Sequence, residues 1–413
     1  MTAATGSTMA NRAARRPYQD PPRLIRVEIT ITGSTSMSTW KQNYRKRFPL
    51  GVLVLALIGS VAWASDWTVV RQRDRPYVTF ANVAQFYQFP EYTHVSRTVS
   101  LRSERRVIRA QAGTSEFSIN GVRFFANFPL LSSGDDDLIS VVDVSKIIEP
   151  VLRPSRIHEA EKIETVVLDP GHGGTDQGAS SSWGTEKGFA LDVALAARRE
   201  LIRAGYRVEM TRVNDVGVSL EDRVNFANRF SHAVFVSIHF NSSSGGAGVE
   251  SYALAPEAVP STASSEHHVS GAGLERHAGN ALDGQNIALT ASIHAAVLSR
   301  VSAFDRGVRH ARFHVLRDIK IPAVLLEGGF ISDPAEGQRI ATGYYRQQLG
   351  TAIAQGIQNY NAAVNYRAGV TNFAVAKTNL PPHAHSISEP LGADKPVEPN
   401  PLHPPSISIN AGE

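Results

Sequence analysis

The chain has 413 residues, a formal net charge of +4 and no cysteine. This length exceeds the usual size of one hydrophobic core, so two domains with additional tails are expected. The lack of cysteine excludes disulfides and thiolate metal sites, so any metal must be held by His, Asp or Glu. The arginines are scattered instead of forming a basic stripe with interleaved aromatic residues, so we expect no nucleic-acid partner.

A secretory signal peptide is predicted near the N-terminus. Basic residues at 45–47 precede an apolar run over 50–61, and Ala-Trp-Ala at 62–64 closes it. The apolar run is shorter than the roughly 20 residues that cross a bilayer. We therefore interpret residues 1–64 as leader and signal peptide, with translation starting at Met37. The alternative is an uncleaved membrane anchor. We expect no contact with a membrane other than through this segment. In both cases the protein is expected to be exported to the periplasm or cell wall.

Residues 66–154 are predicted to form a small α+β domain. Strand-type runs lie at 77–80, 95–101, 107–110, 117–119 and 122–125, and a short helix is expected at 81–87. Asn120-Gly121 is a hairpin signal. The stretches "SINGVRFFANFPLL" and "DDDLISVVDVSKIIEPVL" resemble the copper amine oxidase N-terminal-like domain. The resemblance carries no chemical motif, so either a wall-binding module or a structural spacer is expected.

From Thr165 onward strands and helices alternate, which is typical of a parallel α/β sheet. Strands are predicted at 165–168, 206–211, 233–238, 248–254 and 324–326, and helices at 186–204, 220–230, 286–301 and 345–360. In the first helix we expect one buried side formed by Leu191, Leu195, Leu201 and Ile202. The predicted fold class is α/β, a mostly parallel twisted sheet flanked by helices over 161–362, preceded by the small α+β domain.

Two segments interrupt or follow this alternation. Residues 256–283 are rich in Ser, Ala, Gly and His and are too long for an ordinary loop, so we interpret them as a functional or mobile insertion. Residues 367–413 are polar and rich in proline, and we expect this tail to be disordered.

Four residues with metal-binding or acid-base side chains stand at the ends of predicted elements. His172 lies in a glycine-rich turn after a strand, and Glu186 opens the next helix. His239 and Glu327 each end a further strand. The crevice of an open α/β sheet lies outside the carboxyl ends of its strands, so these side chains can converge. Two imidazoles and one carboxylate make a catalytic zinc set with a fourth position for water, which leaves Glu327 as a base.

The same motifs carry a resemblance to a known family. "LDPGHGGTDQGA", "EK", "TRVND", "SLEDRVNFAN", "SIHFNS" and "DRGVRHARFHVLRDIKIPAVLLEGGFISDPAE" are similar, in this order, to the zinc-dependent N-acetylmuramoyl-L-alanine amidases. The similarity covers residues 163–360. It implies that His172, Glu186 and His239 hold Zn²⁺ and that Glu327 is the catalytic carboxylate. It also implies peptidoglycan as substrate, cut between N-acetylmuramic acid and L-alanine for wall remodelling or daughter-cell separation.

Three further residues are candidates for substrate contacts. Asn241 is expected to contact substrate or the surroundings of a metal ligand, with a structural turn role as the alternative. Arg306 and Arg309 are candidates for binding stem-peptide carboxylates, or else belong to the solvated surface. His294 is interpreted as a surface or core histidine without a chemical role.

The insertion is predicted to regulate the site or to border it, and two alternative functions are considered. In the cell-division branch of these amidases an added helix covers the zinc until an activator displaces it. This implies an activator protein that acts on residues 256–283, whereas the alternative is a flexible loop at the cleft. A zinc peptidase acting on wall peptides would use the same metal chemistry. A non-catalytic wall-binding regulator is expected to lack one of the four residues, and all four are present.

Overall fold

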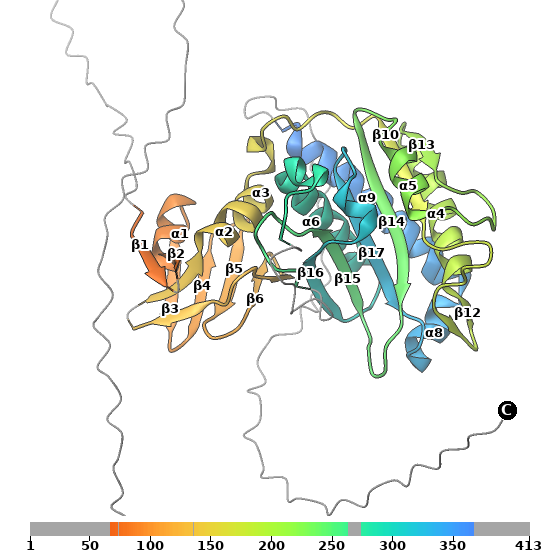
Figure 1. Cartoon of the computed structure of the whole chain (residues 1–413). Coiled ribbons are helices and arrows are strands. Elements are labelled where there is room, and N and C mark those ends of the chain that lie inside the picture. The colour runs from red at the N-terminus through yellow and green to blue at the C-terminus, as the bar shows by residue number, and fades with distance from the viewer. Residues whose placement is uncertain (1–66, 73, 135, 263–273, 367–413) are drawn as a thin grey trace, which may run out of the picture. The chain divides into compact units, whose positions relative to one another are not determined.

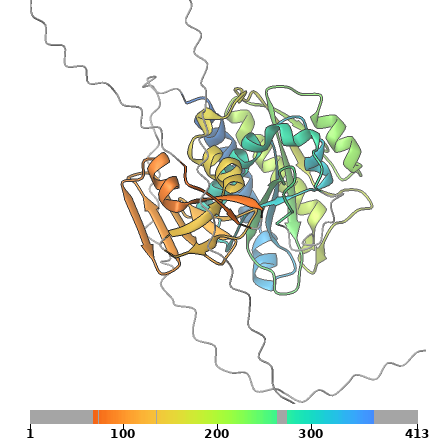
Figure 2. The same ribbon diagram turned by 60° about the vertical axis from the view of Figure 1, so that its left-hand side comes forward.

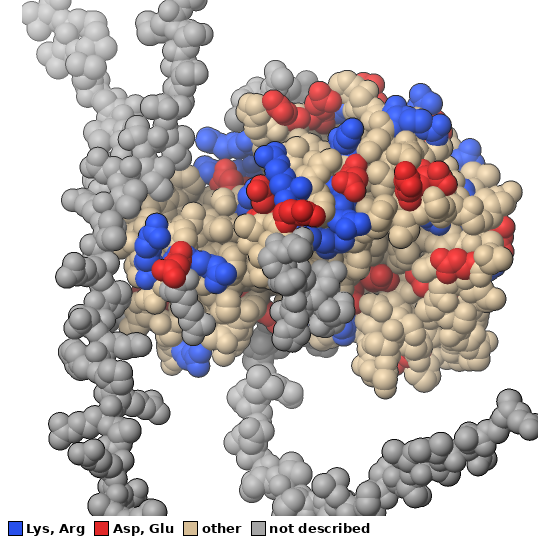
Figure 3. Space-filling view, viewed as in Figure 1, with Lys and Arg blue, Asp and Glu red and all other residues tan. Residues whose placement is uncertain are grey.

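The computed structural model of the chain describes residues 67–366, except 73, 135 and 263–273 (Figure 1). The predicted signal peptide, the start at Met37, the proline-rich tail and the middle of the insertion lie outside the described residues. Figure 3 shows Lys and Arg side chains interspersed with Asp and Glu over the described part of one face. Of the helices in the described ranges, none combines the length and the apolar character needed to traverse a bilayer.

The residues from Thr165 onward form alternating strands and helices (Figure 1). The strands are β10 (Thr165–Pro170), β11 (Ser180–Ser181), β12 (Gly184–Thr185), β13 (Arg207–Met210), β14 (Ala233–Asn241), β15 (Val249–Leu254), β16 (Asp305–Ala311) and β17 (Ala323–Phe330). The helices are α4 (Glu186–Arg203), α5 (Leu220–Ala227), η4 (Ala278–Leu282), α6 (Asp283–Arg300), α7 (His314–Arg317), α8 (Pro334–Ile340) and α9 (Gly343–Val364).

These strands form the centre of a three-layer arrangement (Figures 1 and 2). β13, β10, β14 and β17 are parallel neighbours, β15 is antiparallel to β17, and β16 is parallel to β15. Because side chains alternate along a strand, Val166 and Leu168 pack in the core with α4, α6 and α9, whereas Val167 packs in the core with α5 and α7. The predicted α/β class, with a mostly parallel sheet between helices, is confirmed.

The buried side of α4 differs from the predicted one. Small side chains, among them Ala190, Ala194 and Ala197, are buried. Ile202 is exposed, so its predicted place on the buried side is wrong. Close packing explains the difference, because a Cβ at Gly350 of α9 would lie only 2.6 Å from that of Ala196. α4 and α9 therefore approach through small residues, which a search for large apolar side chains does not detect.

The N-terminal segment, defined here as residues 67–156, consists mainly of strands. These are β1 (Val69–Gln72), β2 (Arg75–Thr79), β3 (Glu91–Val95), β4 (Thr98–Arg102), β5 (Val107–Gln111), β6 (Glu116–Ile119), β7 (Val122–Phe125), β8 (Leu131–Ser133) and β9 (Asp136–Ser140). The helical elements are α1 (Phe80–Phe86), α2 (Val141–Asp143), the π-helix η1 (Val144–Ile148), α3 (Glu149–Leu152) and η2 (Pro154–Arg156).

Two sheets share these N-terminal strands. β1, β2, β9 and β8 form a four-stranded sheet, whereas β3 to β7 form an antiparallel run. β7 pairs in parallel with β16 at Phe124 and Val308, which extends the central sheet to 11 strands among the described residues. Val308, Ala253 and Ile287 belong to the same buried cluster as the N-terminal apolar residues. The N-terminal segment and the α/β strands therefore share part of one core.

The backbone conformation at two turns confirms one prediction for the N-terminal segment and contradicts another. Asn120 and Gly121 have φ values of 53° and 84°, as the predicted hairpin requires. The single strand predicted over 95–101 is wrong, because Ser96 has a φ of 58° and the chain turns there between β3 and β4. Strand-type residues on both sides of Ser96 and Arg97 conceal this turn in the sequence.

Candidate metal centre

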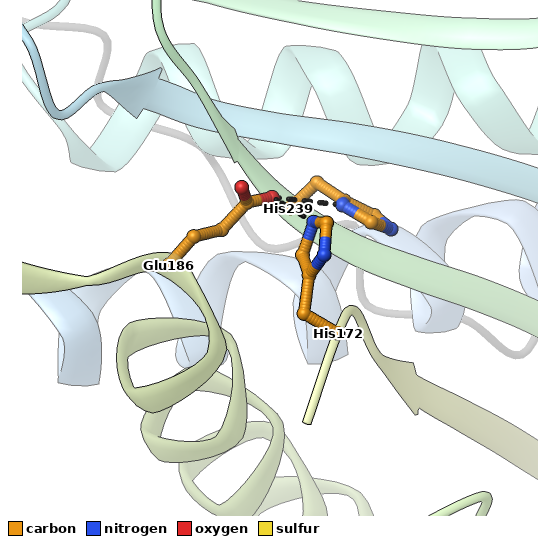
Figure 4. Close-up of side chains that lie close together, drawn as sticks. All are labelled: His172, Glu186 and His239. Atoms are coloured by element: carbon orange, nitrogen blue, oxygen red, sulfur yellow. Dashed lines mark hydrogen bonds and ion pairs between the residues drawn. The ribbon is translucent and has the colours of Figure 1, made fainter. Parts of the chain in front are cut away.

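Three of the predicted residues converge at one point (Figure 4). One ligand atom each from His172, Glu186 and His239 lies within 4.8 Å of the others. His172 Nε2 is 3.0 Å, and His239 Nδ1 is 2.8 Å, from the same oxygen, Oε1 of Glu186. Two imidazole nitrogens and a carboxylate oxygen thus point at a common centre.

The sheet explains why residues so distant in sequence meet. β10 and β14 are parallel neighbours with Pro170 opposite Ile238, so the turn that holds His172 begins beside His239. Glu186 is the first residue of α4, and its carboxylate reaches back over the strand ends. Its oxygens accept hydrogen bonds from the backbone N–H of Ala179 at 2.9 Å and of Phe240 at 3.1 Å. These bonds fix the carboxylate between the two histidines.

Glycine is required at two places where the backbone passes the side chains of this centre. A Cβ at Gly171 would lie 2.3 Å from Cε1 of His239. Gly178 has a φ of +63°, and a Cβ there would lie 2.6 Å from both Glu186 Oε2 and His172 Cδ2. His172 itself has a φ of 59°, a conformation that is uncommon for non-glycine residues and occurs often at functional sites.

A buried ion pair supports this turn from below. Asp169 is fully buried, and its Oδ1 lies 2.6 Å from Nη1 of Arg223. Arg223 also donates to the backbone carbonyls of Pro170 and His172, both at 2.7 Å. Arg212 donates to the carbonyl of Gly171 at 2.7 Å. These three charged residues were given no role from the sequence, although all lie within the quoted motifs.

Asp176 orients one of the histidines. Its Oδ2 lies 2.8 Å from Nδ1 of His172, on the ring nitrogen that does not face Glu186. Metal-binding histidines commonly have such a carboxylate on their second nitrogen, which fixes the ring and its tautomer. The arrangement leaves Nε2 of His172 directed at the common centre.

Glu327 lies directly beside this centre. It is the register partner of His239 across β14 and β17, and both residues line one cleft. Its Oε2 atom is buried without a hydrogen-bond partner in the described part of the chain. Burial and the neighbouring carboxylates of Glu186 and Glu250 hold the pKa of Glu327 well above its ordinary value. A buried carboxyl oxygen without a partner is costly, so this atom is suited to bind a substrate, water or cation.

The three further candidates meet at a residue that the sequence analysis did not single out. Glu250 on β15 is 3% exposed and accepts a hydrogen bond from Asn241 Nδ2 at 2.8 Å. Arg309 Nε and Arg306 Nε lie 3.2 Å and 3.5 Å from its carboxylate. Asn241 lines the cleft, whereas neither arginine is among the residues that line it. A glutamate within a strand gives no sequence signal, so only the tertiary contacts identify Glu250.

His294 behaves as a core histidine, as one of the two interpretations predicted. It is fully buried on α6, with Nδ1 2.8 Å from Ser251 Oγ and Nε2 3.0 Å from Asp305 Oδ1. Both ring nitrogens are thus satisfied within the core.

The charges of the centre fit a divalent cation. Burial alone would raise the pKa of Glu186, but hydrogen bonds from His172 and His239 outweigh burial and lower this pKa. The hydrogen bond to Glu186 in turn raises the pKa of His172. These surroundings favour the ionised form of Glu186, and two imidazoles with one carboxylate are a donor set found in catalytic zinc sites that keep one position open.

Comparisons with known proteins agree with these motifs. The N-acetylmuramoyl-L-alanine amidase family matches residues 166–359. The sporulation-specific N-acetylmuramoyl-L-alanine amidase of Bacillus subtilis strain 168 is 32% identical over 226 residues, 54% of this chain and 78% of the relative. The amidase CwlM of Bacillus licheniformis is 31% identical over 215 residues, 50% of this chain and 75% of the relative.

One solved structure is similar as well, and the family match does not include the N-terminal segment. The crystal structure of N-acetylmuramoyl-L-alanine amidase from Clostridium difficile 630 is 31% identical, with a TM-score of 0.40. It covers 48% of this chain and 97% of that chain. The family match begins after the N-terminal segment, whose resemblance to the copper amine oxidase N-terminal-like domain stays a prediction.

Proposed function

The chain belongs to the N-acetylmuramoyl-L-alanine amidases, a family of peptidoglycan hydrolases, and from this premise we propose that it is a zinc-dependent member. The bond cut is the amide between the lactyl carboxyl of N-acetylmuramic acid and the amino group of L-alanine. The biological outcome is wall remodelling or daughter-cell separation. The observation that carries the proposal is the convergence of His172, Glu186 and His239 beside Glu327.

The metal role rests on the chemistry of the donor set. His172, Glu186 and His239 would hold the ion through two nitrogens and one oxygen. A zinc ion held there would supply Lewis acidity toward the scissile carbonyl and water, and its positive charge would favour the ionised form of Glu327. Asp176 keeps the ring of His172 in the orientation that this role needs.

The residues of the chain then divide the work of hydrolysis. Glu327, as carboxylate, takes a proton from the attacking water and returns it to the departing nitrogen of L-alanine. Its buried oxygen without a partner supports this role, because a reacting group can occupy the open position. Asn241 lines the same cleft and, as an amide that Glu250 holds, offers a hydrogen-bonding group to substrate.

Several features outside the centre remain part of this proposal. Export through the segment at 45–64 would bring the enzyme to its substrate in the periplasm or cell wall. An activator protein would act on the insertion at 256–283. The domain limits at 66–154 and 161–362, with the tail at 367–413, complete the proposed organisation.

The products of peptidoglycan digestion test the proposal. We expect mass spectrometry of purified peptidoglycan, digested by the full chain, to show stem peptides with a free L-alanine amino terminus and glycan strands with free lactyl carboxyl groups. A chelator should abolish both products, and added zinc should restore them. New amino termini within the stem peptide would instead identify a peptidase, and unchanged digestion after complete metal removal would contradict zinc dependence.

A further inference from the structure

A line of side chains runs from the N-terminal segment to the cleft. The guanidinium carbon of Arg309 on β16 lies 3.7 Å from the ring centroid of Phe125 on β7. Its Nε lies 3.2 Å from the carboxylate of Glu250 on β15. Glu250 accepts a hydrogen bond from Asn241 and is the direct register partner of Glu327 on β17. These contacts therefore connect Phe125 of the N-terminal segment, through Arg309 and Glu250, with the cleft.

A β-bulge in β16 makes this line possible. Val249 is opposite Asp305 and Glu250 is opposite Gly307, so Arg306 is the extra residue. Gly307 has a φ of +91°, and a Cβ there would lie 2.9 Å from Cε2 of Phe125. Bulges beside active sites commonly redirect a side chain, and this one lets Phe125 approach the backbone of β16. The bulge and Gly307 thus determine where the Phe125 ring lies between β7 and β16.

The contact between Arg309 and Glu250 matters because the Glu250 carboxylate is buried. A carboxylate that is 3% exposed must be paired, because an uncompensated buried charge is strongly unfavourable. The side chain of Arg309 is 14% exposed, and it is covered by the Phe125 ring. An aromatic face over a partly desolvated guanidinium both attracts it and restricts its motion. Arg309 also donates from Nε to the carbonyl of Arg306 and from Nη1 to the carbonyl of Thr262, both at 3.2 Å. Loss of the ring would therefore loosen Arg309 against Glu250 without releasing it.

We propose that Phe125 is a positioning residue for catalysis, which holds Arg309 on Glu250 and thereby orients the Asn241 amide in the cleft that Glu327 also lines. The N-terminal segment accordingly completes the active site instead of acting only as a spacer or a wall-binding module. This inference rests on the proposed function, because its effect is read in amide hydrolysis.

The test compares Phe125→Leu with Phe125→Tyr in the full chain. The substrate is a soluble N-acetylmuramoyl-tripeptide, so that no polymer is present whose binding elsewhere on the protein could change KM. We expect Phe125→Leu to lower kcat about five- to twentyfold, with KM within about twofold of wild type, because a misplaced cleft impairs the transition state more than binding. Phe125→Tyr keeps the aromatic ring and should keep kcat, and bound zinc should be unchanged in both variants.

A second aromatic contact at the same joint provides the control. Phe304 is 58% exposed, and its ring centroid lies 5.1 Å from the guanidinium carbon of Arg123, which is not among the partners of Glu250 named above. Phe304→Leu should therefore have the wild-type kcat. Wild-type kcat in Phe125→Leu, an equal loss in Phe304→Leu, or a change confined to KM would each overturn the inference.

A further variant keeps the test decisive if Phe125→Leu lowers the melting midpoint. Arg309→Lys retains the charge but lacks the planar fork, so we expect a kcat loss of about the same size with intact zinc binding. Wild-type kcat in Arg309→Lys would overturn the inference. A wild-type protein that fails to release L-alanine amino termini would refute the proposed function, a result distinct from any difference among these variants.

Discussion

At the scale of single residues, the cleft combines one strongly hydrogen-bonded carboxylate with one that lacks a partner. Glu186 accepts bonds from two imidazoles and two backbone N–H groups. Glu327 has a buried oxygen without a hydrogen bond in the described residues. The first environment stabilises a fixed negative charge, as a metal ligand needs, and the second leaves an oxygen ready for proton transfer. The two glutamates thus have surroundings that suit the different roles proposed for them.

The variant Glu327→Gln separates these roles. It keeps the shape of the side chain but removes the proton acceptor, so we expect the rate of amide hydrolysis to fall on the order of a thousandfold. Zinc content, measured by mass spectrometry of the metal, should stay at the wild-type level because Glu327 is outside the donor set. Glu161→Gln, at a side chain that is 59% exposed, is the matched control and should keep full activity. A fully active Glu327→Gln enzyme would refute the proposed base.

The sequence predicted the residues of the centre but not the residues that support it. His172, Glu186, His239 and Glu327 were recognisable because glycine-rich turns and strand ends mark them. Glu250 was not recognisable, because its place beside the cleft depends on partners up to 59 residues away in the sequence, such as Arg309. Pairings of this kind depend on sheet register, which the pattern of apolar residues does not specify for polar side chains at a strand end.

At the scale of elements, the loop between β10 and α4, together with the first residue of α4, supplies two of the three side chains of the centre. His172 and Glu186 stand at its two ends, and Gly178 lets the loop fold back between them. The loop is held by backbone hydrogen bonds to Asp176 and Glu186 instead of by a large apolar core. Its geometry therefore depends on a glycine that no side chain can replace without moving Glu186 or His172.

The variant Gly178→Ala tests this dependence. The added methyl group would lie 2.6 Å from Glu186 Oε2 and from His172 Cδ2, so we expect zinc affinity to fall by at least about tenfold. Gly205→Ala is the control, because Gly205 also has a positive φ of +89° but nothing lies within 4 Å of its Cβ position. It should cost about 1 kcal/mol of stability without changing zinc affinity. Equal zinc affinity in both variants, measured by competition with a chromophoric chelator, would contradict this account of the loop.

Strand β16 is one of the elements that were not predicted from the sequence. Its residues Asp305 to Ala311 carry three charges and a glycine, a pattern that indicates a loop more than a strand. The strand forms because β15 on one side and β7 on the other supply its hydrogen-bond partners. Tertiary pairing thus outweighs local propensity, and the joint between the N-terminal segment and the central sheet could not be predicted from the chain alone.

At the scale of the whole described molecule, one core connects the N-terminal strands with the α/β sheet. Buried polar groups in the N-terminal segment should therefore affect the stability of the enzyme. Asp143 is fully buried and accepts hydrogen bonds from the backbone N–H of Asn127 and from Ser140 Oγ. Burial outweighs these bonds and raises the pKa of Asp143 from 3.8 to about 6.

This raised pKa predicts a pH dependence of stability. Because the folded state favours the protonated carboxyl, the stabilising contribution of Asp143 is complete below about pH 4 and is lost as pH rises through about 6. In the variant Asp143→Asn the side chain stays neutral. Its free energy of unfolding should therefore gain on wild type by on the order of 3 kcal/mol between about pH 4 and pH 7. Urea unfolding at several pH values measures the difference, and parallel curves for both proteins would contradict the prediction.

The central claim is that His172, Glu186 and His239 together hold one zinc ion, and the zinc content of purified full-length protein tests it most directly. After loading with zinc and dialysis, we predict close to one zinc ion per chain in wild type and in Glu327→Gln. His239→Ala removes one of the three ligands and should lose nearly all bound zinc while keeping its circular dichroism spectrum. A folded His239→Ala protein with a full complement of zinc, or a wild-type protein that retains none, would contradict the account.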